Sequence, residues 1–269
     1  MEIGSHLDMF LARLLEEFGY DFTGYSRDSL QRRIVRIMSL WKVAELEGLL
    51  EKMLMDPSMA GSFVQQVTVP LTSMFRDPSF FLDLRQRVIP YLSTYPLIRV
   101  WIAGCSTGEE AYSMAILLKE AGLMERSLIY ATDLNPVSVE IACQGLVPME
   151  NLGEYTENYF SSGGTGELSD YFSSKQGRFR FSDELRSRMV FSTHNLAGDS
   201  SFNSFQLILC RNVLIYFRRS LQGTVLELFH TSLENAGFLG LGPKETLLFS
   251  SLRGRFQQIG DQKIWQKIN

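Results

Sequence analysis

Apolar residues recur at helical spacing in the first quarter of the chain. The clearest run comprises Leu7, Phe10, Leu11, Leu14, Leu15 and Phe18. Further helices are expected over residues 26–40 and 44–55. We therefore predict an N-terminal helical domain over residues 1–75, followed by a linker over 76–95.

From residue 96 onward, apolar runs of strand length alternate with helix-like segments. The predicted strands span 99–104, 127–134, 189–195, 205–212, 238–241 and 264–268. The predicted helices span 109–121, 135–145 and 220–235. This alternation predicts an α/β domain over 96–269 with a mainly parallel sheet, whose ligands bind at the carboxyl ends of the strands. The insert 155–181 has no helical period, and we expect a small lobe there.

Composition and charge narrow the class of protein. The chain has 269 residues, of which 45% are hydrophobic, so it can bury the cores of a large and a small domain. Its net charge of −4 argues against nucleic acid as a partner. The sequence contains no apolar run of about 18 residues or more, so we expect no membrane-spanning segment. Three scattered cysteines and three histidines without ligand-like spacing predict a cytoplasmic protein without disulfides or structural metal. We expect a monomer.

The turn after the first predicted strand, in RVWIAGCSTGEEAYSMAILL (99–118), has an unusual chemistry. Gly104 and Gly108 allow a ligand to approach the backbone, and Glu109 and Glu110 open the following helix. Carboxylates at this position would repel a pyrophosphate but attract an ammonium or a sulfonium. Asp133, at the end of the next strand, could accept hydrogen bonds from both hydroxyls of a ribose.

S-adenosylmethionine fits these side chains because it has a ribose, an adenine and both kinds of cation. The alternative is that the acidic pair only caps its helix. A nicotinamide dehydrogenase fits less well, since the turn lacks the G-x-G-x-x-G spacing of dinucleotide-binding folds.

Five segments of the chain resemble, in order, the CheR family of chemoreceptor glutamate O-methyltransferases. They are TSMFRD (72–77), WIAGCSTGEEAYSMA (101–115), ATDLN (131–135), VFSTHNL (190–196) and LILCRNVLIYF (207–217). The resemblance implies a Rossmann-like, seven-stranded class I methyltransferase sheet, an N-terminal all-helical domain and a small β-subdomain at about 155–188. It also implies transfer of a methyl group from S-adenosylmethionine to receptor glutamates, giving methyl esters and S-adenosylhomocysteine.

The resemblance also implies roles for individual residues. Arg76 and Tyr216 match the proposed catalytic pair of the family. The residues that match cofactor-binding positions are Thr72, Arg76, Gly104, Glu109, Asp133, Asn195, Leu196, Cys210, Arg211 and Asn212. Arg32, Arg33 and Arg36 resemble the receptor-binding helix of the family, within a segment of local charge +4 over 27–42. Such a surface would attract the acidic helical cytoplasmic region of a membrane chemoreceptor.

The sequence departs from the family pattern at several positions. Pro70 stands where asparagine is common, and Lys244 replaces a small hydroxyl residue in GPKE. The insert 155–181 is longer than in members that bind a receptor's C-terminal pentapeptide, so we do not expect that tether. Two other functions remain open: a methyltransferase for another protein or a small carboxylate, and a non-catalytic, cofactor-bound receptor adaptor. His194 is expected to be a structural residue of its strand.

Overall fold

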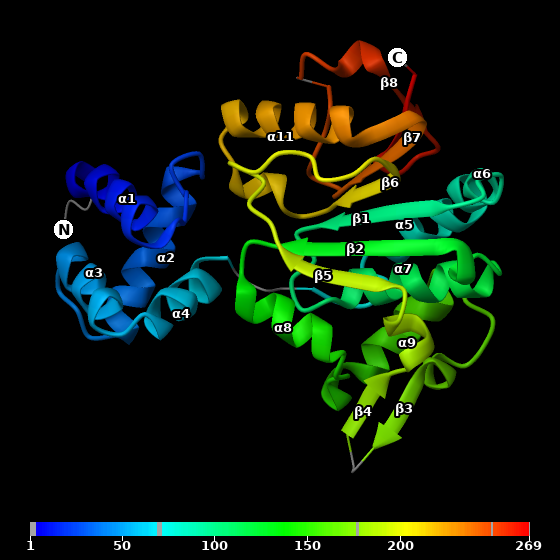
Figure 1. The fold of residues 1–269 in the computed structure, drawn as a ribbon, viewed down its shortest axis with the longest axis horizontal. Helices are drawn as coiled ribbons and strands as arrows, with labels where there is room; N and C mark the ends of the chain where they lie inside the picture. Colours follow the sequence, from blue (N-terminus) through cyan, green and yellow to red (C-terminus); the bar gives the residue numbers. More distant parts are fainter. Residues whose placement is uncertain (1–3, 69–71, 176–177, 249, 269) are drawn as a thin grey trace.

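The computed structural model describes residues 4–68, 72–175, 178–248 and 250–268, and its centre is a seven-stranded sheet (Figure 1). The strand order is β5-β2-β1-β6-β7-β9-β8. The strands are β1 (Ile98–Ala103), β2 (Ser127–Asp133), β5 (Met189–Thr193), β6 (Phe205–Cys210), β7 (Leu233–Leu241), β8 (Phe256–Ile259) and β9 (Ile264–Lys267). Neighbours from β5 to β7 pair in parallel, and β9 is antiparallel to both of its neighbours. The predicted α/β class is confirmed, whereas β8 was missed.

Helices cover both faces of the sheet, because successive side chains of a strand point to opposite sides. Val100 and Ile102 of β1 belong to one core, and Trp101 and Ala103 belong to the other. The first core includes α5 (Pro78–Asp83), the π-helical turn η1 (Leu84–Val88), α6 (Ile89–Leu92), α7 (Glu109–Glu120) and α9 (Leu152–Ser161). The second includes α11 (Arg219–Ser232). Helix α8 (Pro136–Gln144) packs on β2 and β5.

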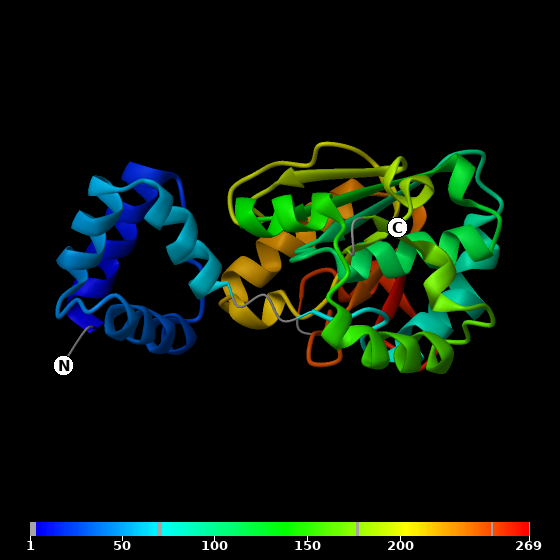
Figure 2. The same ribbon diagram turned by 90° about the horizontal axis from the view of Figure 1, so that it is seen from below.

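The N-terminal helices form a separate body beside the carboxyl ends of the parallel strands (Figures 1 and 2). They are α1 (Gly4–Phe18), α2 (Arg27–Leu40), α3 (Leu46–Met55) and α4 (Ser58–Val67). The chain between α1 and α2 contacts the sheet domain directly: the Ser26 amide donates to the Tyr216 carbonyl at 2.8 Å, and the Arg218 amide donates to the Gly24 carbonyl at 2.8 Å. The helical body is therefore attached next to the edge where a parallel sheet binds ligands.

Two expectations for the organisation of the chain were wrong. Residues 78–92, within the expected linker, are helical, and Phe81 and Leu84 are fully buried against the sheet. The insert begins with the helix α9, whose buried face consists of Tyr155 and Tyr159 instead of aliphatic residues, so its period was not recognised. The expected small lobe follows, as a hairpin of β3 (Phe172–Lys175) and β4 (Arg178–Phe181) and the short α10 (Asp183–Arg186).

Single helical turns complete the described chain. They span Met124–Arg126, Met149–Asn151, Leu168–Tyr171, Leu214–Tyr216 (η5) and Arg253–Arg255. Among the described helices, none is both long and apolar enough to cross a membrane.

Candidate functional site

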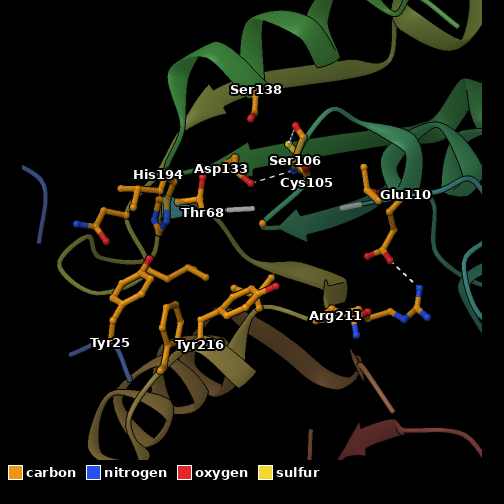
Figure 3. Close-up of a pocket in the computed structure, with 18 of the residues that line it drawn as sticks. Tyr25, Thr68, Cys105, Ser106, Glu110, Asp133, Ser138, His194, Arg211 and Tyr216 are labelled. Carbon is orange, nitrogen blue, oxygen red and sulfur yellow. Dashed lines mark hydrogen bonds and ion pairs between the residues drawn. The ribbon is translucent and has the colours of Figure 1, made fainter. Parts of the chain in front are cut away.

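A cleft of about 960 Å³, counted to its open mouth, lies at the carboxyl ends of β1, β2, β5 and β6 (Figure 3). The sheet domain supplies most of its wall. The N-terminal domain supplies Tyr25, Arg33 and Thr68.

The turn between β1 and α7 forms the floor of the cleft with its backbone. Gly104 has φ +84°, and a Cβ there would collide with the side chain of Val213. Gly108 has φ +101°, and a Cβ there would lie 2.9 Å from the Cβ of Ala142. Both positions therefore require glycine, and Gly104 is one of the lining residues.

Asp133 ends β2 and faces the same cleft. Its Oδ2 accepts a hydrogen bond from the Ser106 amide at 2.9 Å, and its Oδ1 accepts one from the Asn135 amide at 2.9 Å. Burial raises the pKa of Asp133, and these backbone donors oppose the rise. Each oxygen retains a lone pair, so the carboxylate can still accept hydrogen bonds from a vicinal diol.

The two glutamates at the start of α7 point in different directions. Glu110 lines the cleft and accepts a hydrogen bond from Nη1 of Arg211 at 2.7 Å. Glu109, which the sequence assigned to the cofactor, is not in the wall. Its carboxylate instead accepts hydrogen bonds from the Thr107 hydroxyl at 2.7 Å and the Tyr155 hydroxyl at 3.3 Å. Consecutive residues of a helix point about 100° apart, so only one of the pair can face the cleft.

Arg211 is held by the protein on several sides. Its side chain is 1% exposed, and Nη2 donates to Oδ2 of Asp77 at 2.7 Å and to the Arg76 carbonyl at 2.9 Å. Its guanidinium also lies 4.1 Å from the centre of the Phe80 ring. These contacts fix the backbone around Asp77, which has φ +57°. Arg211 therefore lines the cleft but chiefly positions its neighbours. Burial raises the pKa of Glu110, and the Arg211 guanidinium opposes that rise.

The loop after β5 forms a second side of the cleft. Leu196 offers an apolar surface, and the Asn195 side chain accepts a hydrogen bond from the Ala197 amide at 3.0 Å. His194 also lines the cleft, and its contacts are those of a structural residue. Its Nε2 lies 3.3 Å from the Ser200 carbonyl, and its ring packs on Trp101.

Tyr216 and Arg33 meet on the side that the N-terminal domain closes. The Arg33 guanidinium lies 4.6 Å from the centre of the Tyr216 ring and donates to the Val67 carbonyl. Arg33 is thus part of the cleft, whereas Arg32 and Arg36 of the same helix are exposed to solvent. Thr72 and Arg76 also line the cleft.

Glu245 holds the loop that carries Asn212 and Tyr216, a role that the sequence did not reveal. Its Oε1 accepts from the amides of Val213 (2.9 Å) and Ile215 (3.3 Å). Its Oε2 accepts from the amides of Asn212 (3.0 Å) and Gly242 (2.6 Å). The only available signal was an acidic residue shortly after the strand, in GPKE.

Besides Glu109, the predicted position Cys210 does not contribute to the wall. Cys210 is fully buried and is not a lining residue, and burial raises the pKa of its thiol. Lys244 is exposed and lines a different cleft. Pro70 lies outside the described residues.

The cleft fits a ligand that has hydroxyl, amino and cationic groups. Ser106 Oγ, His194 Nδ1 and Arg211 Nε are buried at lining residues and have no hydrogen-bond partner within the described chain. Asp133 suits a ribose, and Leu196 suits a flat base. Glu110 suits an ammonium. S-adenosylmethionine has all of these groups.

Comparison with known proteins agrees with this chemistry. Residues 70–264 match the CheR methyltransferase SAM-binding domain, and residues 5–68 match the CheR methyltransferase all-alpha domain. Cher3 of Pseudomonas putida, named as a methyltransferase, is 46% identical over 93% of this chain and 92% of its own.

Relatives named for chemotaxis are more distant. Chemotaxis protein methyltransferase 2 of Pseudomonas aeruginosa is 33% identical over 84% of this chain and 79% of its own. The chemotaxis protein methyltransferase of Listeria innocua is 29% identical over 89% and 90%, respectively. The chain therefore belongs to the CheR family of S-adenosylmethionine-dependent methyltransferases.

Proposed function

We propose that this protein methylates glutamate side chains of chemoreceptors. The observation that carries the proposal is that one cleft contains both carboxylates and cations. Its carboxylates, Asp133 and Glu110, are suited to the cofactor. Its other lining residues include Arg33, Arg76 and Tyr216, which are suited to a substrate carboxylate. The names of the relatives in Listeria innocua and Pseudomonas aeruginosa support a role in chemotaxis.

The cofactor would be held by residues from three loops. Asp133 would accept hydrogen bonds from the ribose, and Asn195 and Leu196 would flank the adenine. Glu110 would face the ammonium, and the backbone at Gly104 would allow close approach. When bound, S-adenosylmethionine supplies an electrophilic methyl group on a sulfonium sulfur.

The acceptor glutamate needs orientation more than it needs a base. A glutamate carboxylate has a reference pKa of about 4.3, so it is ionised at neutral pH. Arg76 and Arg33 would draw the carboxylate into the cleft, and the Tyr216 hydroxyl would orient it. Very tight ion pairing would stabilise the ionised ground state and slow transfer, because the carboxylate loses charge as it is methylated.

The exposed side of α2 supports an acidic macromolecule as the acceptor. Arg32 and Arg36 are exposed on the same helix whose Arg33 enters the cleft. Positive charge around a cleft raises the association rate of an acidic partner at low salt. An acidic receptor helix that docks on α2 would therefore have its glutamates near Tyr216.

The first experiment measures transfer of labelled methyl groups to membranes that contain the chemoreceptors of the source organism. Wild type, Arg76→Ala and Tyr216→Phe are compared, with the exposed Arg253→Ala as the matched control. Cofactor affinity is measured for each by calorimetry. We expect label that mild alkali releases, as from a carboxyl ester. Arg76→Ala should reduce transfer by about 10²-fold or more while the cofactor still binds.

The other outcomes separate the alternatives. Alkali-stable label, or label on a small carboxylate only, would identify a methyltransferase with a different acceptor. Tight cofactor binding without transfer to any acceptor would support the adaptor. Either result would contradict the proposed function.

A further inference from the structure

A second cleft, of about 660 Å³, lies on the other side of the loop that carries Tyr216. Its wall includes Leu214 and Ile215 from that loop, Arg219 and Gly223 from α11, and Lys244. Val213 and Tyr216, in the same loop, line the first cleft. The two clefts are therefore separated by the helical turn η5. Arg219 begins α11, and this end of the helix faces the N-terminal domain (Figure 1).

The second cleft is lined by two cationic side chains, Arg219 and Lys244, and one carboxylate, Glu245. Within the described part of the chain, no carboxylate forms an ion pair with Arg219 or Lys244. Glu245 is also in the wall, but both of its oxygens already accept hydrogen bonds from backbone amides. The two cations consequently remain available to an anionic ligand.

The presence of glycine at position 223 is a second, independent indication of a binding site. It lies in the second turn of α11, where glycine is less favourable than alanine. A Cβ at this position would meet no atom within 4 Å, so packing within the chain does not require glycine. Its missing side chain leaves the surface of the helix open to close approach from the cleft.

We propose that this cleft binds a second acidic side chain of the acceptor polypeptide, next to the glutamate that is methylated. The proposal rests on the proposed function, since it assumes an acidic protein acceptor in the first cleft. Arg219 and Lys244 would bind the second carboxylate, and Gly223 would admit the backbone that carries it. Such a site selects acceptors with neighbouring acidic residues and does not contact the reacting atoms.

The test compares Arg219→Ala, Lys244→Ala and the double variant with Lys52→Ala, which removes an exposed charge from α3. Initial rates are measured against receptor concentration at low and high salt. We expect each single variant to raise KM for the receptor about fivefold, with kcat changed less than twofold. The double variant should also show a weaker salt dependence of kcat/KM. Cofactor affinity should stay unchanged throughout.

Gly223→Ala separates binding from folding. Alanine in this helix should raise the melting temperature or leave it unchanged, while its methyl group enters the cleft. We therefore expect a more stable protein with a higher KM for the receptor. A variant that folds well and keeps the wild-type KM would contradict the proposal.

Binding of fluorescent poly-L-glutamate gives a readout that does not need methyl transfer. Weaker binding to the Arg219 and Lys244 variants than to Lys52→Ala would support the anion-binding site. This holds even if the wild type transferred no label, a result that would overturn only the proposed function. Equal binding and equal KM across all variants, with an active wild type, would overturn the inference alone.

Discussion

At the scale of single residues, Asp133 is the side chain best suited to bind the ribose of the cofactor. Its two oxygens are oriented by the amides of Ser106 and Asn135. A hydrogen bond to a charged group is worth about 1.5–3 kcal/mol, and about 1.4 kcal/mol corresponds to a tenfold change in affinity. We expect Asp133→Ala to weaken binding of S-adenosylmethionine about 10- to 100-fold, as measured by calorimetry.

The affinity of the cofactor should also depend on pH. Burial raises the pKa of Asp133 above its ordinary value of 3.8, and only the ionised carboxylate accepts two hydroxyl donors. As pH falls from neutrality through this raised pKa, protonation should compete with the ligand and its Kd should rise. In the ligand-free protein the sign is opposite: the folded state binds the proton more tightly than the unfolded state, so this group favours folding as pH falls through the same window.

A variant that cannot ionise at position 133 tests the predicted pH dependence. Asp133→Asn should bind weakly at every pH and lose the part of the pH dependence that Asp133 causes. Tighter binding of S-adenosylmethionine by the wild type on acidification would contradict the role given to this carboxylate.

At the scale of elements, Glu245 fixes the loop between β6 and α11. Four backbone amides converge on one carboxylate that is 4% exposed. In Glu245→Gln the amide nitrogen cannot accept hydrogen bonds, so at least one pair of backbone donors loses its partner. Each buried donor that loses its partner costs about 1–3 kcal/mol.

We therefore expect Glu245→Gln to destabilise the protein by about 2–4 kcal/mol in urea unfolding. Methyl transfer should also fall, because the loop carries Asn212 and Tyr216. The adjacent exposed Lys244→Ser serves as the control and should change stability by less than about 0.5 kcal/mol. Similar stability of the two variants would mean that the loop keeps its shape without the carboxylate.

The fold could be predicted from the sequence further than the site could. Strand-length apolar runs and the turn at Gly104 and Gly108 gave most of the sheet, because those patterns are local. The choice between Glu109 and Glu110 was not local: it depends on how α7 is rotated against the sheet. Glu245 was missed for the same reason, since the amides that it binds lie 30 or more positions earlier, as well as at Gly242.

Two segments differ in the structure from what their sequences predicted. The expected linker 76–95 contains helices whose buried residues, such as Phe81, Leu84 and Val88, recur at helical spacing and pack on the sheet domain. Arg33 was grouped with Arg32 and Arg36 by charge, although neighbouring positions of one helix face different surroundings. The resemblance to a family supplied candidate residues. Which of them line the cleft and which only hold neighbouring residues in place can be decided only from distances in the folded structure.

At the scale of the whole molecule, the N-terminal domain contributes Arg33 to the wall of the first cleft. Its guanidinium stacks on Tyr216, an interaction worth about 1–2 kcal/mol when partly desolvated. Arg33→Ala should reduce kcat for methyl transfer, whereas Arg36→Ala should mainly raise KM for the receptor and weaken its salt dependence. Arg33→Lys should rescue only part of kcat, because a lysine keeps the charge but lacks the planar group. Equal kinetics for the Arg33 and Arg36 variants would contradict this division.

Tyr25 links the folding of the two domains. Its ring packs edge-on against Phe217 at 4.9 Å and against Phe22 at 4.9 Å, and it also lines the cleft. Residues of α1 to α4 and of the α11 side of the sheet share one continuous core around this contact. We therefore expect the wild type to unfold in a single transition when followed by fluorescence and by circular dichroism.

Tyr25→Ala should remove this link and separate the two transitions. Truncation of a buried aromatic residue costs about 3–5 kcal/mol, and the loss falls where the domains meet. The N-terminal helices should then melt before the sheet, and S-adenosylmethionine should raise the melting temperature of the sheet domain more than that of the helices. Tyr25→Phe should keep a single transition, since the ring contacts with Phe217 and Phe22 remain. If Tyr25→Ala also unfolded in one transition, the rest of the shared core would be sufficient to couple the two domains. The N-terminal domain would then hold Tyr216 in place through Arg33 and the hydrogen bonds of residues 24–26, without a contribution from Tyr25.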